Sequence, residues 1–109
     1  LILGITFKEN CNDTRNTKII DVYNELVAYG IDVDIFDDNV DHEIVEKNLG
    51  VSIVKKFSLY DGIILAVAHD SFKNIDIQSL KKNDKSIVFD LKGFYDDKTV
   101  NSRLWYMII

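Results

Sequence analysis

The chain opens on an apolar run in which apolar and polar residues do not alternate. Leu1–Phe7 is rich in aliphatic and β-branched residues, and Asp61–Val67 and Ser86–Asp90 have the same character. Runs of this kind predict strands buried on both faces, as in a parallel sheet covered by helices. Ile31–Phe36 instead alternates apolar with acidic residues, which predicts a strand with one face in water, near a sheet edge.

Helical segments separate these runs. The apolar spacing predicts a helix that starts near Asn16 or Thr17, where side-chain oxygens can cap it, and that stops at Gly30. Asp41 predicts the start of a short helix through Leu49. The remaining expectations are a helical stretch from Asp70 or Ser71, another over Ile77–Lys82, a helical turn over Asp96–Arg103, a last strand over Leu104–Ile109, and either helix or strand over Val51–Leu59.

Strands that alternate with helices predict an α/β fold. We expect a Rossmann-like three-layer sandwich, with a mainly parallel sheet and helices on both faces. The 109 residues suit one domain, 1–109, and because the chain opens inside a strand without Met we expect a fragment of a longer protein. Ligands of such sheets bind outside the carboxyl ends of the strands. The loops to search therefore follow Phe7, Phe36, Val67 and Asp90.

Composition excludes several kinds of partner and site. The formal net charge of −5 argues against duplex nucleic acid, whose phosphates bind through many cations. No apolar run approaches the roughly 20 residues that span a bilayer, so we expect no membrane partner. A single cysteine, Cys11, is compatible with a reducing compartment, so we expect the cytoplasm. Two distant histidines and one cysteine give no metal-ligand spacing, so no metal site is expected.

The loop after the first predicted strand holds the most informative polar residues. It lacks the G-x-G-x-x-G with which a Rossmann unit of the usual kind binds a dinucleotide. Lys8 directly follows the strand and Arg15 lies where the next helix begins, so both can hold a phosphate together with the helix N-terminus. The alternative is that Arg15 pairs with Asp13 or Asp37 while Lys8 is only solvated.

Three segments, in order along the chain, resemble one family. They are Gly4–Lys18, Asp61–Asp70 and Val88–Gly93. They look like the C-terminal, UDP-binding domain of the UDP-glucose/GDP-mannose dehydrogenase family, and the resemblance runs from about residue 1 to 104. The Phe-Lys-Glu-Asn-Cys loop and the Ala-His-Asp segment look most like the branch that acts on UDP-N-acetylhexosamines. Asn12 stands where that branch usually has proline, which loosens the preset backbone of the loop.

The resemblance implies an enzyme whose chemistry lies outside this chain. Family members oxidise the primary alcohol of a nucleotide sugar, here UDP-N-acetylhexosamine or UDP-glucose, to a carboxylate in two hydride transfers to NAD. Their N-terminal domain holds NAD, and a central region supplies a catalytic cysteine and lysine. The resemblance thus implies those two domains as partners, no catalytic residue in this chain, a homo-oligomer at full length, and a role in making surface polysaccharide precursors.

The resemblance also implies roles for four residues of this sequence. Phe7 and Lys8 would contact the UDP-sugar, partly through the backbone. Lys92 stands where the family places a basic residue against the substrate, in some members that of a neighbouring subunit. Arg15 would reach toward the NAD cofactor held by the other domain. These roles suit the chemistry, because lysine binds phosphate as a point charge and arginine can donate a bidentate pair.

Several residues of the loops have two interpretations. Cys11 is expected to be an inert loop thiol, because a nucleophile needs a lowered pKa and a positioned base. His69 follows the third strand and is expected to be a hydrogen-bonded turn residue, although a histidine there can titrate near neutrality. Asp37–Asp38 is interpreted as a turn, since the glycine motif that would accompany a ribose-binding acid is missing.

Two other functions stay open beside the dehydrogenase hypothesis. A receiver-like signalling domain has a similar α/β build, and Asp37–Asp38 with Lys92 suggests a phosphoryl site. A receiver, however, needs acids at the end of its first strand, where this chain has Thr6-Phe7-Lys8. A non-catalytic packing scaffold is the third possibility, because fold does not determine function.

Overall fold

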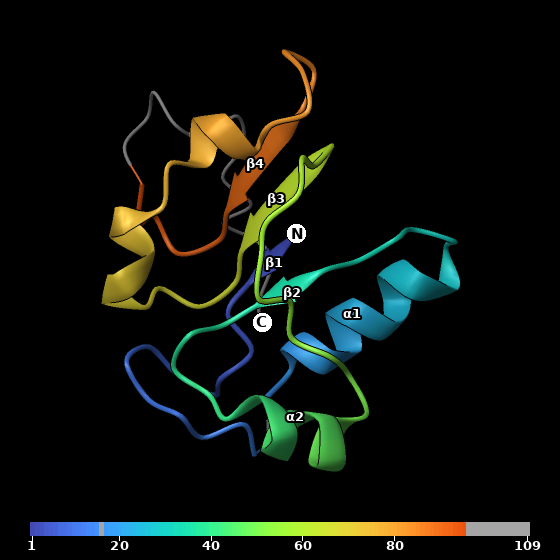
Figure 1. Ribbon diagram of the computed structural model, residues 1–109, viewed down its shortest axis with the longest axis vertical. Coiled ribbons are helices and arrows are strands. Elements are labelled where there is room, and N and C mark those ends of the chain that lie inside the picture. The colour runs from blue at the N-terminus through green and yellow to red at the C-terminus, as the bar shows by residue number, and fades with distance from the viewer. Residues whose placement is uncertain (16, 96–109) are drawn as a thin grey trace.

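The computed structural model describes residues 1–15 and 17–95. Within these residues the strands form one parallel sheet in the order β2-β1-β3-β4. Their bounds are β1 Ile2–Leu3, β2 Ile35–Phe36, β3 Gly62–Leu65 and β4 Ile87–Asp90. The chain passes from β1 to β2 on one side and then to β3 on the other, so the topological switch point lies between β1 and β3 (Figure 1). The predicted α/β fold is confirmed.

Both described α-helices contribute to one apolar layer. They are α1 (Ile19–Ala28) and α2 (His42–Leu49). Ile19 of α1 and Val45 of α2 are buried in a cluster with Ile2 and Ile35 from the strands. Figure 1 shows the two helices close together on the same side of the molecule. The second face of the sheet therefore needs a different cover.

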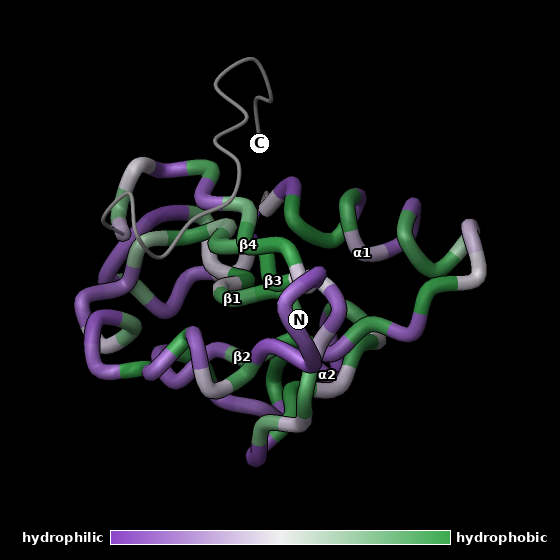
Figure 2. Tube along the Cα trace, turned by 90° about the horizontal axis from the view of Figure 1, so that it is seen from above, coloured by the Kyte–Doolittle hydropathy of each residue, from purple (hydrophilic) through white to green (hydrophobic). Residues whose placement is uncertain are grey.

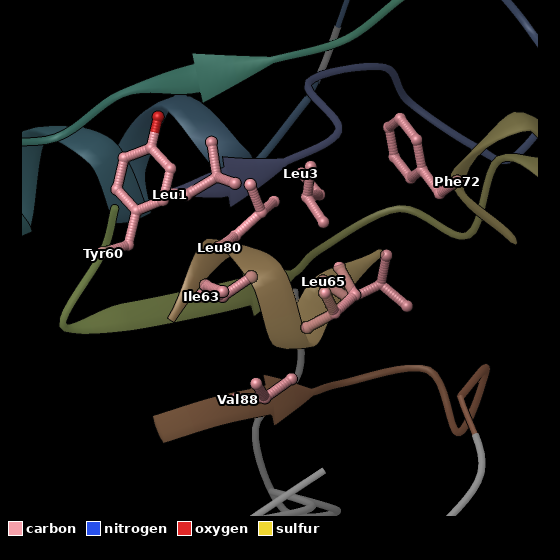
Figure 3. Packing of buried hydrophobic residues seen from close by; sticks show 9 residues of the cluster. Leu1, Leu3, Tyr60, Ile63, Leu65, Phe72, Leu80 and Val88 are labelled. Atoms are coloured by element: carbon pink, nitrogen blue, oxygen red, sulfur yellow. The ribbon is translucent and has the colours of Figure 1, made fainter. Parts of the chain in front are cut away.

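Two short 3-10 helices help to cover that second face. They are η1 (Asp70–Asn74) and η2 (Ile77–Leu80). Phe72 of η1 and Leu80 of η2 belong to a buried cluster with Leu3 and Leu65 (Figure 3). Figure 2 shows the strands as a hydrophobic interior, with hydrophilic segments around them. The sequence predicts helices on both faces, and on this face the described ones are 3-10 helices of five and four residues.

The local signals for α2 act as predicted. The Asp41 carboxylate accepts the N–H groups of Glu43 and Ile44, which caps the helix, and Gly50 ends it with a φ of 70°. For α1, Thr17 Oγ1 accepts the N–H of Ile19 at 3.3 Å, and the helix begins two residues later than that threonine. No helix among the described residues is long and apolar enough to cross a membrane.

The first strand is shorter than predicted. Leu1–Phe7 was expected to form a strand, but pairing covers only Ile2–Leu3. Gly4 turns the backbone to a φ of +102°, which L side chains rarely adopt. A Cβ on Gly4 would lie 2.6 Å from the Cβ of Val67, so only glycine fits where the loop crosses the end of β3.

Other predicted strands are also shorter in the structure, because a strand extends only as far as its hydrogen-bonded neighbours. Ile31–Phe36 pairs only over Ile35–Phe36, at the end of the strand order as predicted. Val51–Leu59, for which the sequence allows helix or strand, contributes a single parallel bridge between Ile53 and Ile35. The helical turn predicted over Asp96–Arg103 and the strand over Leu104–Ile109 lie outside the described residues.

Candidate functional site

A cleft opens at the carboxyl ends of the strands. It encloses about 280 Å³ between the loop after β1, the start of α1, the end of β3 and the loop after β4. Its described lining includes Phe7, Lys8, Lys18 and Lys92. The other lining residues are Thr6, Glu9, Thr17, Ile19, Ala66 and Val67. Three lysines that are far apart in the sequence therefore line one hollow, which we call the cationic cleft.

The charge of the cationic cleft runs against that of the chain. Lys8, Lys18 and Lys92 are all exposed, and Glu9 is the acidic member of the described lining. The chain as a whole carries a formal charge of −5. The N-terminus of α1 adds partial positive charge at the same place. The arrangement can therefore attract an anionic ligand.

The structure brings together three of the four residues that the resemblance singled out. Phe7, Lys8 and Lys92 line the cationic cleft, whereas Arg15 is absent from its described lining. Arg15 instead holds Asp13 in a bidentate pair, with Nε–Oδ1 and Nη2–Oδ2 distances of 3.1 Å. Its side chain is 86% exposed. The hydrogen bonds from Arg15 lower the pKa of the Asp13 carboxyl.

Lys18 is the cleft residue that the sequence analysis missed. It occupies the N-cap of α1, and its side chain makes no capping hydrogen bond. A lysine there is electrostatically unfavourable, because the helix N-terminus itself carries partial positive charge. Because the sequence predicts the helix start at Asn16 or Thr17, no local signal pointed to Lys18.

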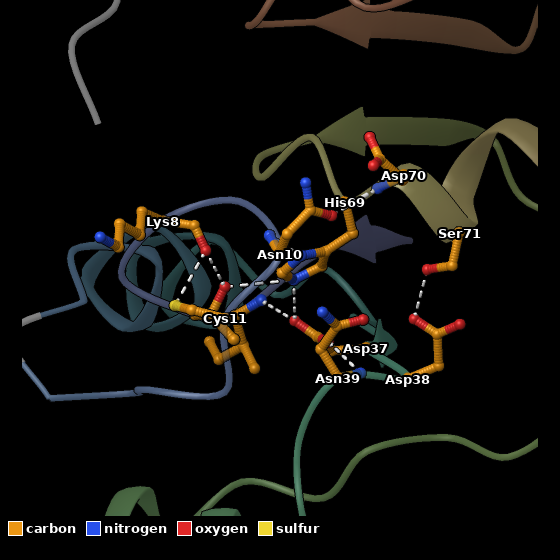
Figure 4. A network of polar contacts seen from close by, with 11 residues as sticks. Lys8, Asn10, Cys11, Asp37, Asp38, Asn39, His69, Asp70 and Ser71 are labelled. Carbon is orange, nitrogen blue, oxygen red and sulfur yellow. Dashed lines mark hydrogen bonds and ion pairs between the residues drawn. The ribbon is translucent and has the colours of Figure 1, made fainter.

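A buried polar cluster lies beside the cationic cleft, and we call its three side chains, Thr6, Asp37 and His69, the buried junction. Their exposures are 1%, 0% and 0%. Asp37 Oδ2 accepts the N–H of Ile5 at 2.8 Å and lies 3.0 Å from His69 Nε2, while Oδ1 accepts the N–H of Asn39 at 2.8 Å (Figure 4). The junction thus ties the chain after β1 to the chain after β2 and β3.

Hydrogen bonding determines which nitrogen of His69 carries the proton. The N–H of Asn10 donates to Nδ1 at 2.8 Å, and a backbone amide can only donate. Nδ1 is therefore the acceptor, and Nε2–H donates to the Asp37 carboxylate. Thr6 Oγ1, 3.1 Å from Nε2, donates in turn to the Lys8 carbonyl at 2.8 Å. The expectation of a hydrogen-bonded turn histidine is confirmed.

Full burial of Asp37 bears on the receiver-like alternative. Both of its carboxylate oxygens accept hydrogen bonds, and none of its surface is exposed. A phosphoryl acceptor needs a free carboxylate oxygen that a donor can reach. Asp37 does form the predicted turn, since Asn39 donates to it, but it is built into the core. The geometry therefore argues against Asp37 as a phosphorylation site.

The loop that carries Lys92 is tied down by a second buried carboxylate. Asp90 accepts the N–H of Lys92 at 3.0 Å and that of Tyr95 at 2.7 Å. Burial, with a further contribution from Asp90, raises the pKa of the Tyr95 hydroxyl, which donates to the Phe72 carbonyl at 3.2 Å. These contacts hold the backbone at Lys92 while its side chain stays exposed.

Cys11 lies in the same loop as Lys8. The Cys11 thiol donates to the Lys8 carbonyl at 3.1 Å, so it ties the loop rather than presenting a nucleophile. Within the described part of the chain, no group of three or more His, Cys, Asp or Glu side chains could hold a metal ion. Nor does any buried side-chain nitrogen or oxygen described here lack a hydrogen-bond partner.

Comparison with known proteins adds independent information. Residues 1–97 match the UDP-glucose/GDP-mannose dehydrogenase family, UDP binding domain. The chain is 53% identical over 97 residues to a UDP-N-acetyl-D-glucosamine 6-dehydrogenase of Salmonella typhi, covering 84% of the chain and 23% of that relative. It is 44% identical over 108 residues to a UDP-N-acetyl-D-glucosamine 6-dehydrogenase of Pseudomonas aeruginosa, with coverages of 95% and 26%. Protein CapL of Staphylococcus aureus is 39% identical over 110 residues, with coverages of 95% and 26%. The chain spans about a quarter of the length of these relatives.

Proposed function

Because this chain belongs to the UDP-glucose/GDP-mannose dehydrogenase family and matches its UDP binding domain, we propose that the cationic cleft binds the UDP part of a nucleotide sugar. The observation that carries the proposal is the meeting of Lys8, Lys18 and Lys92 on one cleft of an acidic chain. A diphosphate is an anion of matching charge and size, and lysine binds it as a flexible point charge.

Phe7 supports a nucleotide rather than a bare phosphate. This residue is 59% exposed although it follows a buried strand. An exposed aromatic ring beside cations offers a stacking surface for a base, while the lysines hold the phosphates. The cleft volume of about 280 Å³ is near the lower end of the range for small-ligand sites. We assign Phe7, Lys8 and Lys92 to the substrate on this basis.

The full-length protein, in this proposal, is an NAD-dependent oxidoreductase that oxidises the primary alcohol of a UDP-sugar to a carboxylate. UDP-N-acetyl-D-glucosamine is the preferred candidate, because two relatives carry that substrate in their names. In this proposal NAD and the catalytic residues belong to other domains, and Arg15 is the residue of this chain assigned to that cofactor. We also propose that the full-length protein is a homo-oligomer, that it works in the cytoplasm, and that it supplies precursors of surface polysaccharide. The free thiol of Cys11 is compatible with that compartment.

Titration of UDP into the full-length protein tests the site. Lys8→Ala and Lys92→Ala should each weaken binding by about tenfold, which corresponds to about 1.4 kcal/mol of lost charge-assisted contact. Lys85→Ala is the matched control, because Lys85 is exposed and lies outside the described lining of the cleft. Unchanged affinity in both cleft variants would overturn the assignment.

A further inference from the structure

We infer that His69 is a positioning residue for the UDP site. It does not line the cationic cleft, but it holds the loop that carries Phe7 and Lys8. The inference rests on the proposed function and adds to it a residue that acts through the loop rather than on the ligand.

The Nδ1 end holds Asn10. Its N–H donates to Nδ1 at 2.8 Å, and its side-chain Oδ1 accepts the N–H of Asp70 at 2.8 Å. Asn10 has a φ of 57°, a conformation that asparagine tolerates better than most residues. Two hydrogen bonds thus clamp one loop residue to a segment 59 and 60 positions away in the sequence.

The Nε2 end reaches the loop through Thr6. Nε2 lies 3.1 Å from Thr6 Oγ1, whose hydroxyl donates to the Lys8 carbonyl at 2.8 Å. Figure 4 shows the Lys8 side chain extending away from His69, so the junction fixes the backbone of this lysine and leaves its ammonium free. Phe72 packs edge-on against the imidazole at 5.1 Å, which holds the ring orientation.

Anchoring of this kind matters because residues 7–10 are all exposed. An exposed loop that is ordered before the ligand arrives loses less conformational entropy on binding. Of the two contacts, the bond from Asn10 to Nδ1 is the direct one. Loss of this acceptor should therefore weaken UDP binding more than loss of the donor at Nε2.

Two substitutions separate these roles. In His69→Asn the amide oxygen can take the place of Nδ1, whereas in His69→Gln the amide NH₂ can take the place of Nε2–H. Titration of UDP into the full-length protein should show roughly tenfold weaker binding for His69→Gln and at most about threefold weaker binding for His69→Asn. A merely structural histidine would give no such order in UDP affinity, because each variant loses the hydrogen bonds of only one end of the imidazole. Ser71→Ala is the control, since Ser71 bonds Asp38 outside the junction and should retain wild-type affinity.

The outcomes distinguish this inference from the proposed function. If the wild-type protein does not bind UDP, the proposed function fails and this inference with it. If the wild-type protein binds UDP and Lys8→Ala weakens it, but the two His69 variants bind equally well, only this inference fails. Should neither variant fold, the ¹⁵N spectrum of the wild-type imidazole tests the hydrogen bonds on which the inference rests. A proton on Nδ1 overturns the inference, because Nδ1 could then not accept from Asn10, whereas a proton on Nε2 supports it.

Discussion

The buried junction and the cationic cleft lie at the carboxyl edge of one sheet. They differ in solvent exposure, because the polar side chains of the junction are buried and the lysines of the cleft are exposed. The junction side chains are at most 1% exposed, and His69 lies within hydrogen-bond distance of both Thr6 and Asp37. Lys8 and Lys92, by contrast, keep their side chains exposed around the cleft. Burial makes each hydrogen bond costly to break and so preserves geometry. Exposure leaves charge available to a ligand, and the junction supplies the rigidity that the exposed loop lacks.

The largest effect is expected when the junction loses its carboxylate. Asp37→Ala removes the carboxylate that accepts from three donors, the N–H groups of Ile5 and Asn39 and the Nε2–H of His69. The free energy of local opening around β1 should fall by about 3 to 5 kcal/mol. Hydrogen exchange of peptides that cover β1, in the full-length protein, measures it.

Asp38→Ala is the matched control for that variant. Asp38 is the next residue and is exposed, and the Ser71 hydroxyl donates to it at 2.8 Å. Its loss should leave the exchange of β1 unchanged, because water replaces the serine contact. Equal effects of the two substitutions would mean that the junction contributes no more than an exposed turn.

Raising the ionic strength should weaken UDP binding to the cleft and leave the buried junction unchanged. We expect this effect to be of intermediate size. Between physiological salt and 1 M salt the screening length falls from about 8 Å to about 3 Å, which weakens exposed charges far more than buried ones. UDP affinity should drop by about fivefold over this range. Local exchange at β1 should stay constant in the same buffers. Salt-independent UDP binding would argue against a cleft that works through exposed lysines.

The smallest effect concerns the exposed pair of Arg15 and Asp13. Hydrogen bonds from Arg15 lower the pKa of Asp13, so the pair contributes stability above the ordinary pKa of Asp13 and loses it as the pH falls through the lowered value. Both groups are exposed to solvent, so Arg15→Gln should leave the melting temperature unchanged. The Asp13 pKa should rise toward its ordinary value, as a carboxyl NMR titration would show. An unchanged Asp13 pKa would mean that the pair does not form in solution.

Sequence patterns predict an element correctly where the contacts that stabilise its ends lie within a few residues. Helix α2 begins after Asp41, which caps it by hydrogen bonds, and ends at Gly50, whose backbone angle stops it. Both signals act within a few residues, and the prediction of that helix was right. The predicted strand over Leu1–Phe7 was too long, because its pairing ends at Gly4, where the loop meets Val67. No pattern within the run itself indicates where its partners stop.

The candidate site divides in the same way. The resemblance singled out Phe7, Lys8 and Lys92, and they line one cleft, yet their contact with UDP stays a prediction. Lys18 was missed because its place on the cleft depends on how α1 packs beside β3. The pairing of Arg15 with Asp13, two residues away, was among the alternatives that the sequence could supply.

By itself, the amino-acid sequence determined the alternation of strands and helices, the caps of α2 and the loops in which polar residues gather, because these follow from hydrophobic spacing and short-range hydrogen bonds. Only the tertiary structure decided that Asp37 and His69 meet beneath the loop of Lys8. Asp37 and His69 are 32 positions apart in the sequence. Their contact depends on the path of the chain across the sheet, since a parallel sheet joins strands that no local pattern can pair.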